Sequence, residues 1–220
     1  MNTSALVAGA LACTVAGGAS ATTFVFDSSS VPQNPNAGFI ERITTTWTPS
    51  NNAFTWSVTF ADQLTTGYTL AVNAGPNPKN NPGQLALLYF DASDTSDVAV
   101  SAYGYNGLNS LNSFIDGNGA DAGVQAPDFI VGTEDSEPDS WLIDASVTDA
   151  DGKRTLTLSI DADVIQDHIP LYPDPDGDPW TGVAFGEKIG YWFHTFRGLN
   201  AGYDADGRLT NWGFSAHGWS

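Results

Sequence analysis

Basic residues are scarce in this chain: 7 of its 220 residues are Lys or Arg, against 25 Asp and Glu, so the formal net charge is −18. A protein that binds DNA or RNA needs a basic stripe along the phosphates, and seven scattered cations do not supply one. Attraction to anionic lipid is disfavoured for the same reason. We therefore expect no nucleic-acid partner, and a protein suited to salty or cation-rich surroundings.

Glutamate and cysteine are also rare. The acids comprise 21 Asp and 4 Glu. Asp favours turns and helix caps, whereas Glu favours helix interiors, so this balance favours β structure. The single cysteine, Cys13, lies in an apolar segment that we expect to be removed, which leaves the mature chain without a disulfide. The hydrophobic share of 41% is enough for a packed core.

The N-terminus has the features of an export signal. Residues 5–19 form an uncharged apolar run, and Ala19 and Ala21 fit the small residues of a signal-peptidase site, although no Lys or Arg precedes Arg42. The run is too short for a comfortable membrane span. We expect a signal peptide over 1–21 and a mature protein, from Thr22, that is secreted or held at a bacterial cell surface without a membrane span. Lipidation at Cys13 is an open alternative.

From Thr22 onward, apolar and polar residues alternate with the period of a half-buried strand. The expected strands cover 39–48, 54–61, 68–73, 85–91, 98–103, 140–148, 154–160, part of 183–196, and 208–214. One short helix is expected at 161–168, with Asp161 as its N-cap. We predict an all-β fold, an antiparallel β-sandwich of jelly-roll type with about ten strands and one short helix, as a single domain over 22–220.

The clearest hairpin joins 140–148 to 154–160. Leu156, Leu158 and Ile160 alternate with hydroxyl residues along its second strand. The connecting residues 149–152 end in Gly152, placed where a type I turn with a following left-handed residue needs positive φ. A loop-rich region is expected from about 104 to 139.

Three aspartates alternate along 173–179, a segment with the sequence PDPDGDP. Carboxylates at Asp174, Asp176 and Asp178 could converge on one hard cation, and Gly177 permits the tight turn that this requires. The segment resembles one Asp-rich repeat of the thrombospondin type 3 calcium units. We predict a Ca²⁺ site at these three residues; the alternative is a solvated acidic turn.

Other chemistry has less support. His168, His194 and His217 are widely spaced along the chain, so no zinc site is expected, and His194 fits a core or sheet position. The chain has no G-x-S-x-G nucleophile motif. Glycoside hydrolysis needs only two suitably separated acids, so Glu41 and Glu187, on or beside expected strands, leave a polysaccharide hydrolase or lyase open.

Aromatic residues in loop-like surroundings suggest a ligand surface. Tyr and Trp rings stack on the C–H face of a sugar, and nearby Asp and Asn bond its hydroxyls. The candidate ligand-binding residues are Tyr103, Tyr105, Trp180 and Tyr203, whereas the strand residues Trp56, Trp141 and Trp192 are expected in the core. Two alternatives remain: the rings simply fill the sandwich, or they face another copy of the chain.

The strand series over about 39–196 resembles β-sandwich carbohydrate-binding modules and DOMON-like sandwiches. Together with the signal segment and the Asp-rich turns, it also resembles exported bacterial surface proteins of the PEP-CTERM class, without their C-terminal sorting tail. We therefore expect a secreted, non-catalytic binding module for extracellular polysaccharide, with Ca²⁺ as its candidate stabilising ion. The alternatives are a structural surface or matrix protein that associates with copies of itself, and a polysaccharide hydrolase or lyase.

Overall fold

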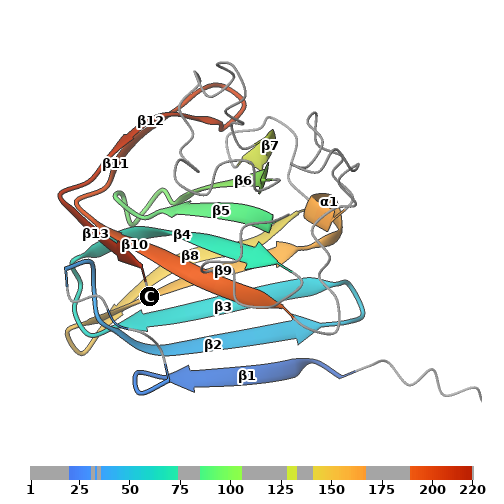
Figure 1. The fold of residues 1–220 in the computed structure, drawn as a ribbon, viewed down its shortest axis with the longest axis horizontal. Coiled ribbons are helices and arrows are strands. Elements are labelled where there is room, and N and C mark those ends of the chain that lie inside the picture. The colour runs from blue at the N-terminus through green and yellow to red at the C-terminus, as the bar shows by residue number, and fades with distance from the viewer. Residues whose placement is uncertain are drawn as a thin grey trace, which may run out of the picture.

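The computed structural model describes residues 20–30, 33, 36–73, 85–105, 128–132, 141–166 and 189–219. The first sheet contains, in spatial order, β1 (Thr22–Asp27), β2 (Ile40–Thr48), β3 (Ala53–Phe60), β9 (Lys153–Asp161) and β8 (Leu142–Ala150). The second contains β13 (Ala216–Trp219), β10 (Gly190–Arg197), β4 (Thr65–Asn73), β5 (Leu85–Asp91), β6 (Ala99–Tyr105) and β7 (Asp128–Gly132). A separate hairpin, β11 (Asn200–Tyr203) and β12 (Leu209–Gly213), and a short helix, α1 (Asp163–Gln166), complete the described elements (Figure 1).

The expected all-β antiparallel sandwich with one short helix is confirmed, and the described residues form thirteen strands where about ten were expected. Each pair among these strands is antiparallel. Strands β1–β3 and β4–β7 are two meanders in separate sheets, and β10 returns to lie beside β4, as in a Greek key.

The core lies between the two sheets. Strand β3 shows how the alternation builds it: Phe54, Trp56, Val58 and Phe60 are buried, while the residues between them lie on the other face. Inward residues of β4, β5 and β9 complete the same apolar cluster, which includes Leu70, Leu88 and Leu158. The core rings stack on one another, with the Phe54 and Trp56 centroids 5.6 Å apart.

The expected hairpin and helix both form, and the turn of the hairpin is tighter than expected. Ala150 pairs with Lys153, so the loop is the two residues Asp151 and Gly152. Their φ angles are +52° and +76°, as in a type I′ turn, which matches the twist of a two-residue hairpin. At the other end of β9, the Asp161 carboxylate accepts the N–H of Asp163 at 2.9 Å and so caps α1.

The second sheet is also covered on its outer face. The β11–β12 hairpin packs there and buries Leu209 against Ala71, Leu87, Tyr89 and Tyr103. Strands β4 and β5 are therefore buried on both faces, which explains their nearly continuous apolar sequences. No helix in the described ranges is long and apolar enough to cross a membrane.

Arg154 joins the two sheets. Its Nε and Nη2 donate to the two carboxylate oxygens of Asp149, both at 2.8 Å, and its Nη1 donates to the Thr65 carbonyl of β4 at 3.0 Å. The hydrogen bond from Arg154 lowers the pKa of Asp149 below its ordinary value. A planar guanidinium is needed to make both contacts at once.

We expect Arg154→Met to lower the free energy of unfolding by about 2 kcal/mol, because it leaves a buried carbonyl and a carboxylate without their donor. Arg154→Lys restores the charge but not the forked geometry and should recover less than half of that loss. Urea unfolding of both variants measures the effect, with the exposed Arg42→Met as the matched control. Equal stabilities of Arg154→Met and Arg42→Met would contradict this role.

Candidate functional site

Two of the four predicted aromatic ligand residues, Tyr103 and Tyr203, lie within the described part of the chain, and both pack inside the fold. Tyr103 lies within β6, not in a loop, and its ring is 0% exposed between the second sheet and the β11–β12 hairpin. Its hydroxyl accepts the N–H of Leu209 at 2.9 Å, so the ring holds the hairpin in place. Tyr203 is partly buried in the same cluster and donates to Asp91 at 3.0 Å. These two rings therefore fill the fold, which was the alternative interpretation.

The remaining sequence candidates lie outside the described side chains. Tyr105 ends β6, but only its backbone is described. Trp180 and the predicted Ca²⁺ ligands Asp174, Asp176 and Asp178 lie outside the described residues, so the calcium site stays a prediction. Within the described ranges, no three His, Cys, Asp or Glu side chains are grouped closely enough to hold a metal ion.

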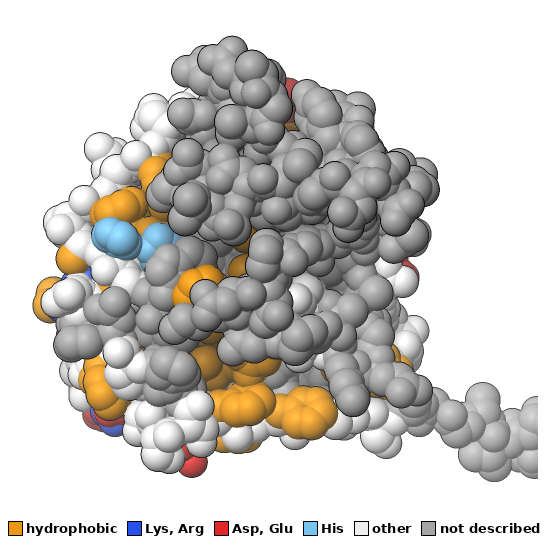
Figure 2. All heavy atoms as spheres, in the orientation of Figure 1, with side chains coloured by type: hydrophobic (Ala, Val, Ile, Leu, Met, Phe, Trp, Pro, Cys, Tyr) orange, Lys and Arg blue, Asp and Glu red, His pale blue; other side chains and the backbone are white. Residues whose placement is uncertain are grey.

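Two histidines far apart in the sequence meet on the outer face of the second sheet. His194 Nε2 and His217 Nδ1 are 2.8 Å apart, because β10 and β13 are neighbours. Phe196 and Phe214 contact the pair, and His194 is 5% exposed. Figure 2 shows the histidines beside hydrophobic side chains. Burial, reinforced by His217, lowers the pKa of His194 to about 3. His194 is thus a neutral sheet residue, in line with the sequence interpretation.

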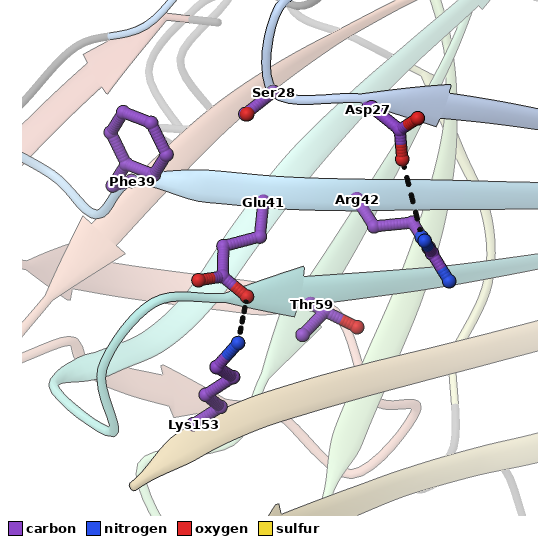
Figure 3. Close-up of a pocket in the computed structure, with 7 residues that line it drawn as sticks. All are labelled: Asp27, Ser28, Phe39, Glu41, Arg42, Thr59 and Lys153. Atoms are coloured by element: carbon purple, nitrogen blue, oxygen red, sulfur yellow. Dashed lines mark hydrogen bonds and ion pairs between the residues drawn. The ribbon is translucent and has the colours of Figure 1, made fainter.

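A charged depression lies on the outer face of the first sheet, with a volume of about 520 Å³ (Figure 3). Strands β1, β2, β3 and β9 line it, together with the residue after β1 and the residue before β2. The lining residues are Asp27, Ser28, Phe39, Glu41, Arg42, Thr59 and Lys153. We call this depression the sheet pocket.

An irregularity in β2 brings two charges into the sheet pocket. Ile40 pairs with Phe60 and Arg42 pairs with Thr59, so Glu41 and Arg42 together oppose one residue of β3. This is a β-bulge, and it turns two consecutive side chains to the outer face. Ile40 and Ile43 on either side both remain in the core. The bulge therefore gathers polar side chains without disturbing the packing beneath.

Two ion pairs cross the sheet pocket. Lys153 Nζ lies 2.6 Å from Glu41 Oε2, and Arg42 Nε lies 3.4 Å from Asp27 Oδ1 (Figure 3). All four side chains are at least one-third exposed. An ammonium has three donors, a guanidinium five, and a carboxylate about four acceptor positions, so each group retains bonding capacity beyond its ion pair. Opposite charges balance here, in a chain of net charge −18.

One aromatic ring stands at the edge of this polar array. Phe39 is 40% exposed and lines the sheet pocket beside Glu41. Hydroxyls on β3 and β9 extend the polar surface: Thr55 bonds Ser159, Ser57 bonds Thr157, and Thr59 bonds Thr155. A ring edged by paired donors and acceptors can bind a ligand that has both an apolar face and many hydroxyl groups.

Sequence reasoning singled out only Glu41 of these residues, as an acid for glycoside hydrolysis. Its suggested partner, Glu187, lies outside the described residues. A usable signal was the segment Ile40–Ile43, where two core residues three apart break the period of two and indicate a bulge. The approach of Lys153 to Glu41 has no such signal, because it depends on how β9 pairs with β3.

Comparison with known proteins found no matching family model, curated protein or solved structure.

Proposed function

We propose that this chain is an exported, non-catalytic module that binds a neutral polysaccharide in the sheet pocket. The observation that carries the proposal is the bulge in β2, which places a donor and an acceptor side by side next to the half-exposed ring of Phe39. The ring stacks on the sugar's C–H face, and Glu41, Arg42 and Lys153 bond its hydroxyls. The apolar run over 5–19 supports export.

Electrostatics favours a neutral ligand over an acidic one. The chain carries a net charge of −18, and its field repels polyanions before they reach the pocket. Within the pocket two cations and two carboxylates offset one another, so nothing compensates for that repulsion. Binding of a neutral glycan should consequently change little with ionic strength.

Titration calorimetry with cellohexaose, xylohexaose and mannohexaose, and with an oligogalacturonate as the acidic comparison, tests this function. We expect at least one neutral oligosaccharide to bind, and Phe39→Ala and Glu41→Gln each to weaken it about 10-fold, which corresponds to about 1.4 kcal/mol. Asp144→Asn, an exposed acid on β8 of the same sheet, is the matched control and should leave affinity unchanged.

Absence of binding by every neutral oligosaccharide, or binding that survives both pocket substitutions, would contradict the proposal. Release of reducing ends from a bound glycan would instead favour the hydrolase or lyase alternative, and loss of that activity in Glu41→Gln would assign the acid. Preference for the oligogalacturonate would contradict the electrostatic argument specifically.

A further inference from the structure

Strand β1 is an edge of the first sheet among the described strands. It pairs with β2 on one side and with no described strand on the other, and it is the lowest strand in Figure 1. Phe24 and Val25 are 54% and 55% exposed. Figure 2 shows hydrophobic side chains on this lower margin of the molecule. A long apolar edge of this kind is a template for pairing with another strand.

Within Thr22–Asp27 themselves, β1 has none of the bulges, prolines or lysines that protect an edge. Its register with β2 runs from Thr22 to Asp27 without a bulge, and it contains no proline or lysine. The opposite edge, β8, differs: its pairing with β9 shifts at Leu142/Asp144, and it carries Asp144 and Asp149. Charges and bulges are the features that prevent edge-to-edge pairing.

The backbone groups available on β1 follow from its hydrogen-bond pattern. The Ser28 N–H donates to Glu41 O at 2.8 Å, in the same register as the strand. Hydrogen-bonded residues alternate in an antiparallel ladder, so Phe24 and Phe26 bond β2 while Thr23, Val25 and Asp27 direct their backbone groups outward. The Asp27 carbonyl confirms this direction, because it accepts the Ser30 N–H outside the β1–β2 ladder at 2.8 Å.

We propose that two copies of this chain pair antiparallel along β1, with the two-fold axis at Val25. This register uses every outward-facing residue of the strand: Val25 bonds Val25 of the second copy, and the Asp27 N–H donates to the Thr23 carbonyl, since the Asp27 carbonyl already accepts the Ser30 N–H. On the core side, Phe24 of each copy lies opposite Phe26 of the other copy, so the two-fold axis creates two such aromatic pairs. Cross-strand aromatic pairs are among the favourable ones in sheets, and these would cover the exposed ring of Phe24.

The charges on β1 are compatible with a second copy as the occupant. Asp27 is the only charged residue of β1, and Arg42 lies 3.4 Å from its carboxylate. In the proposed register Asp27 faces the neutral Thr23, so no like charges oppose one another, although the chain as a whole is strongly acidic. The pairing does not depend on the proposed function, but it would place both sheet pockets on one face, because a two-fold axis perpendicular to a sheet preserves its faces.

Sedimentation equilibrium of the full chain measures the pairing directly. We expect a monomer–dimer equilibrium that Val25→Pro abolishes, since the Val25 N–H serves the partner and not β2, and edge strands tolerate proline at such positions. Val25→Lys should also abolish it by placing two like charges opposite each other. Ile143→Lys, on the opposite edge and 51% exposed, is the matched control and should leave the dimer intact.

A second measurement fixes the register and guards against misfolding. In a Cys13→Ser background, Val25→Cys should cross-link two chains on mild oxidation, because hydrogen-bonded cross-strand residues lie about 5.5 Å apart, within disulfide reach. Ile143→Cys should not. Circular dichroism and the thermal midpoint of each variant verify the fold. A wild-type chain that stays monomeric at millimolar concentration, or a dimer indifferent to both Val25→Pro and Val25→Lys, would overturn the proposal.

Discussion

Replacing Trp56 with alanine should lower the free energy of unfolding by about 3–5 kcal/mol, a large fraction of the total stability of a domain. Trp56 is 0% exposed at the centre of β3 and stacks on Phe54 at 5.6 Å. It pairs across the ladder with Thr45 on one side and Leu158 on the other, so neighbours on both sides hold the cavity open.

A second variant, Trp56→Phe, is to be compared with Trp56→Ala. Among the described residues, the indole N–H of Trp56 has no hydrogen-bond partner, so phenylalanine loses apolar volume but no bond. We expect Trp56→Phe to lower the free energy of unfolding by less than half as much as Trp56→Ala does. Leu64→Ala, at a residue 60% exposed, should change stability by less than about 0.5 kcal/mol. Chemical unfolding of the three variants settles the order, and equal losses in Trp56→Ala and Leu64→Ala would contradict the core assignment.

Acid should destabilise this protein through His194. Its pKa lies near 3 in the folded chain, because the ring is buried and His217 contacts it, against an ordinary value near 6.5. Above pH 6.5 both states hold the ring neutral and the effect vanishes. As the pH falls from 6.5 towards 3, only the unfolded chain takes up the proton, so the free energy of unfolding drops by up to about 1.4 kcal/mol per pH unit.

The variant His194→Phe isolates this contribution. It removes the titrating ring but keeps an aromatic side chain beside Phe196, and the carboxylates that also cause acid unfolding stay the same in both proteins. We expect the difference in unfolding free energy between wild type and variant to shift by more than about 1 kcal/mol between pH 6 and pH 4.5. His217→Gln, at an exposed position, should keep most of the wild-type slope. Parallel pH profiles of wild type and His194→Phe would contradict the buried neutral histidine.

The strands that alternate most regularly were the most predictable from sequence. Residues 54–60 alternate strictly, and β3 occupies Ala53–Phe60. The hairpin of β8 and β9 was predictable for the same reason, with Gly152 marking its turn. Strands β11 and β13 have four residues each, too few for a period to stand out from chance.

The site was less predictable than the fold, because it depends on pairings between distant segments. Tyr103 ends the expected strand 98–103, and its Gly-rich surroundings suggest a ligand surface, but the β11–β12 hairpin covers its ring. Only the apolar run of β5 beside it indicates burial on both faces. The sheet pocket combines β1, β2, β3 and β9, whose order in the sheet no local pattern specifies. The spacing of Ile40 and Ile43 carries a local signal for the bulge, but no local signal indicates the lysine that meets it.

Amide chemical-shift mapping tests the proposed sugar-binding pocket most directly. A two-dimensional NMR spectrum of the labelled chain, titrated with the neutral hexasaccharide that binds, should show its largest shifts at Phe39, Glu41, Arg42, Thr59 and Lys153. The amides of the β11–β12 hairpin, including Tyr203, should remain unmoved. Largest shifts on that hairpin, with the pocket amides unchanged, would contradict the assignment of the sheet pocket as the binding site.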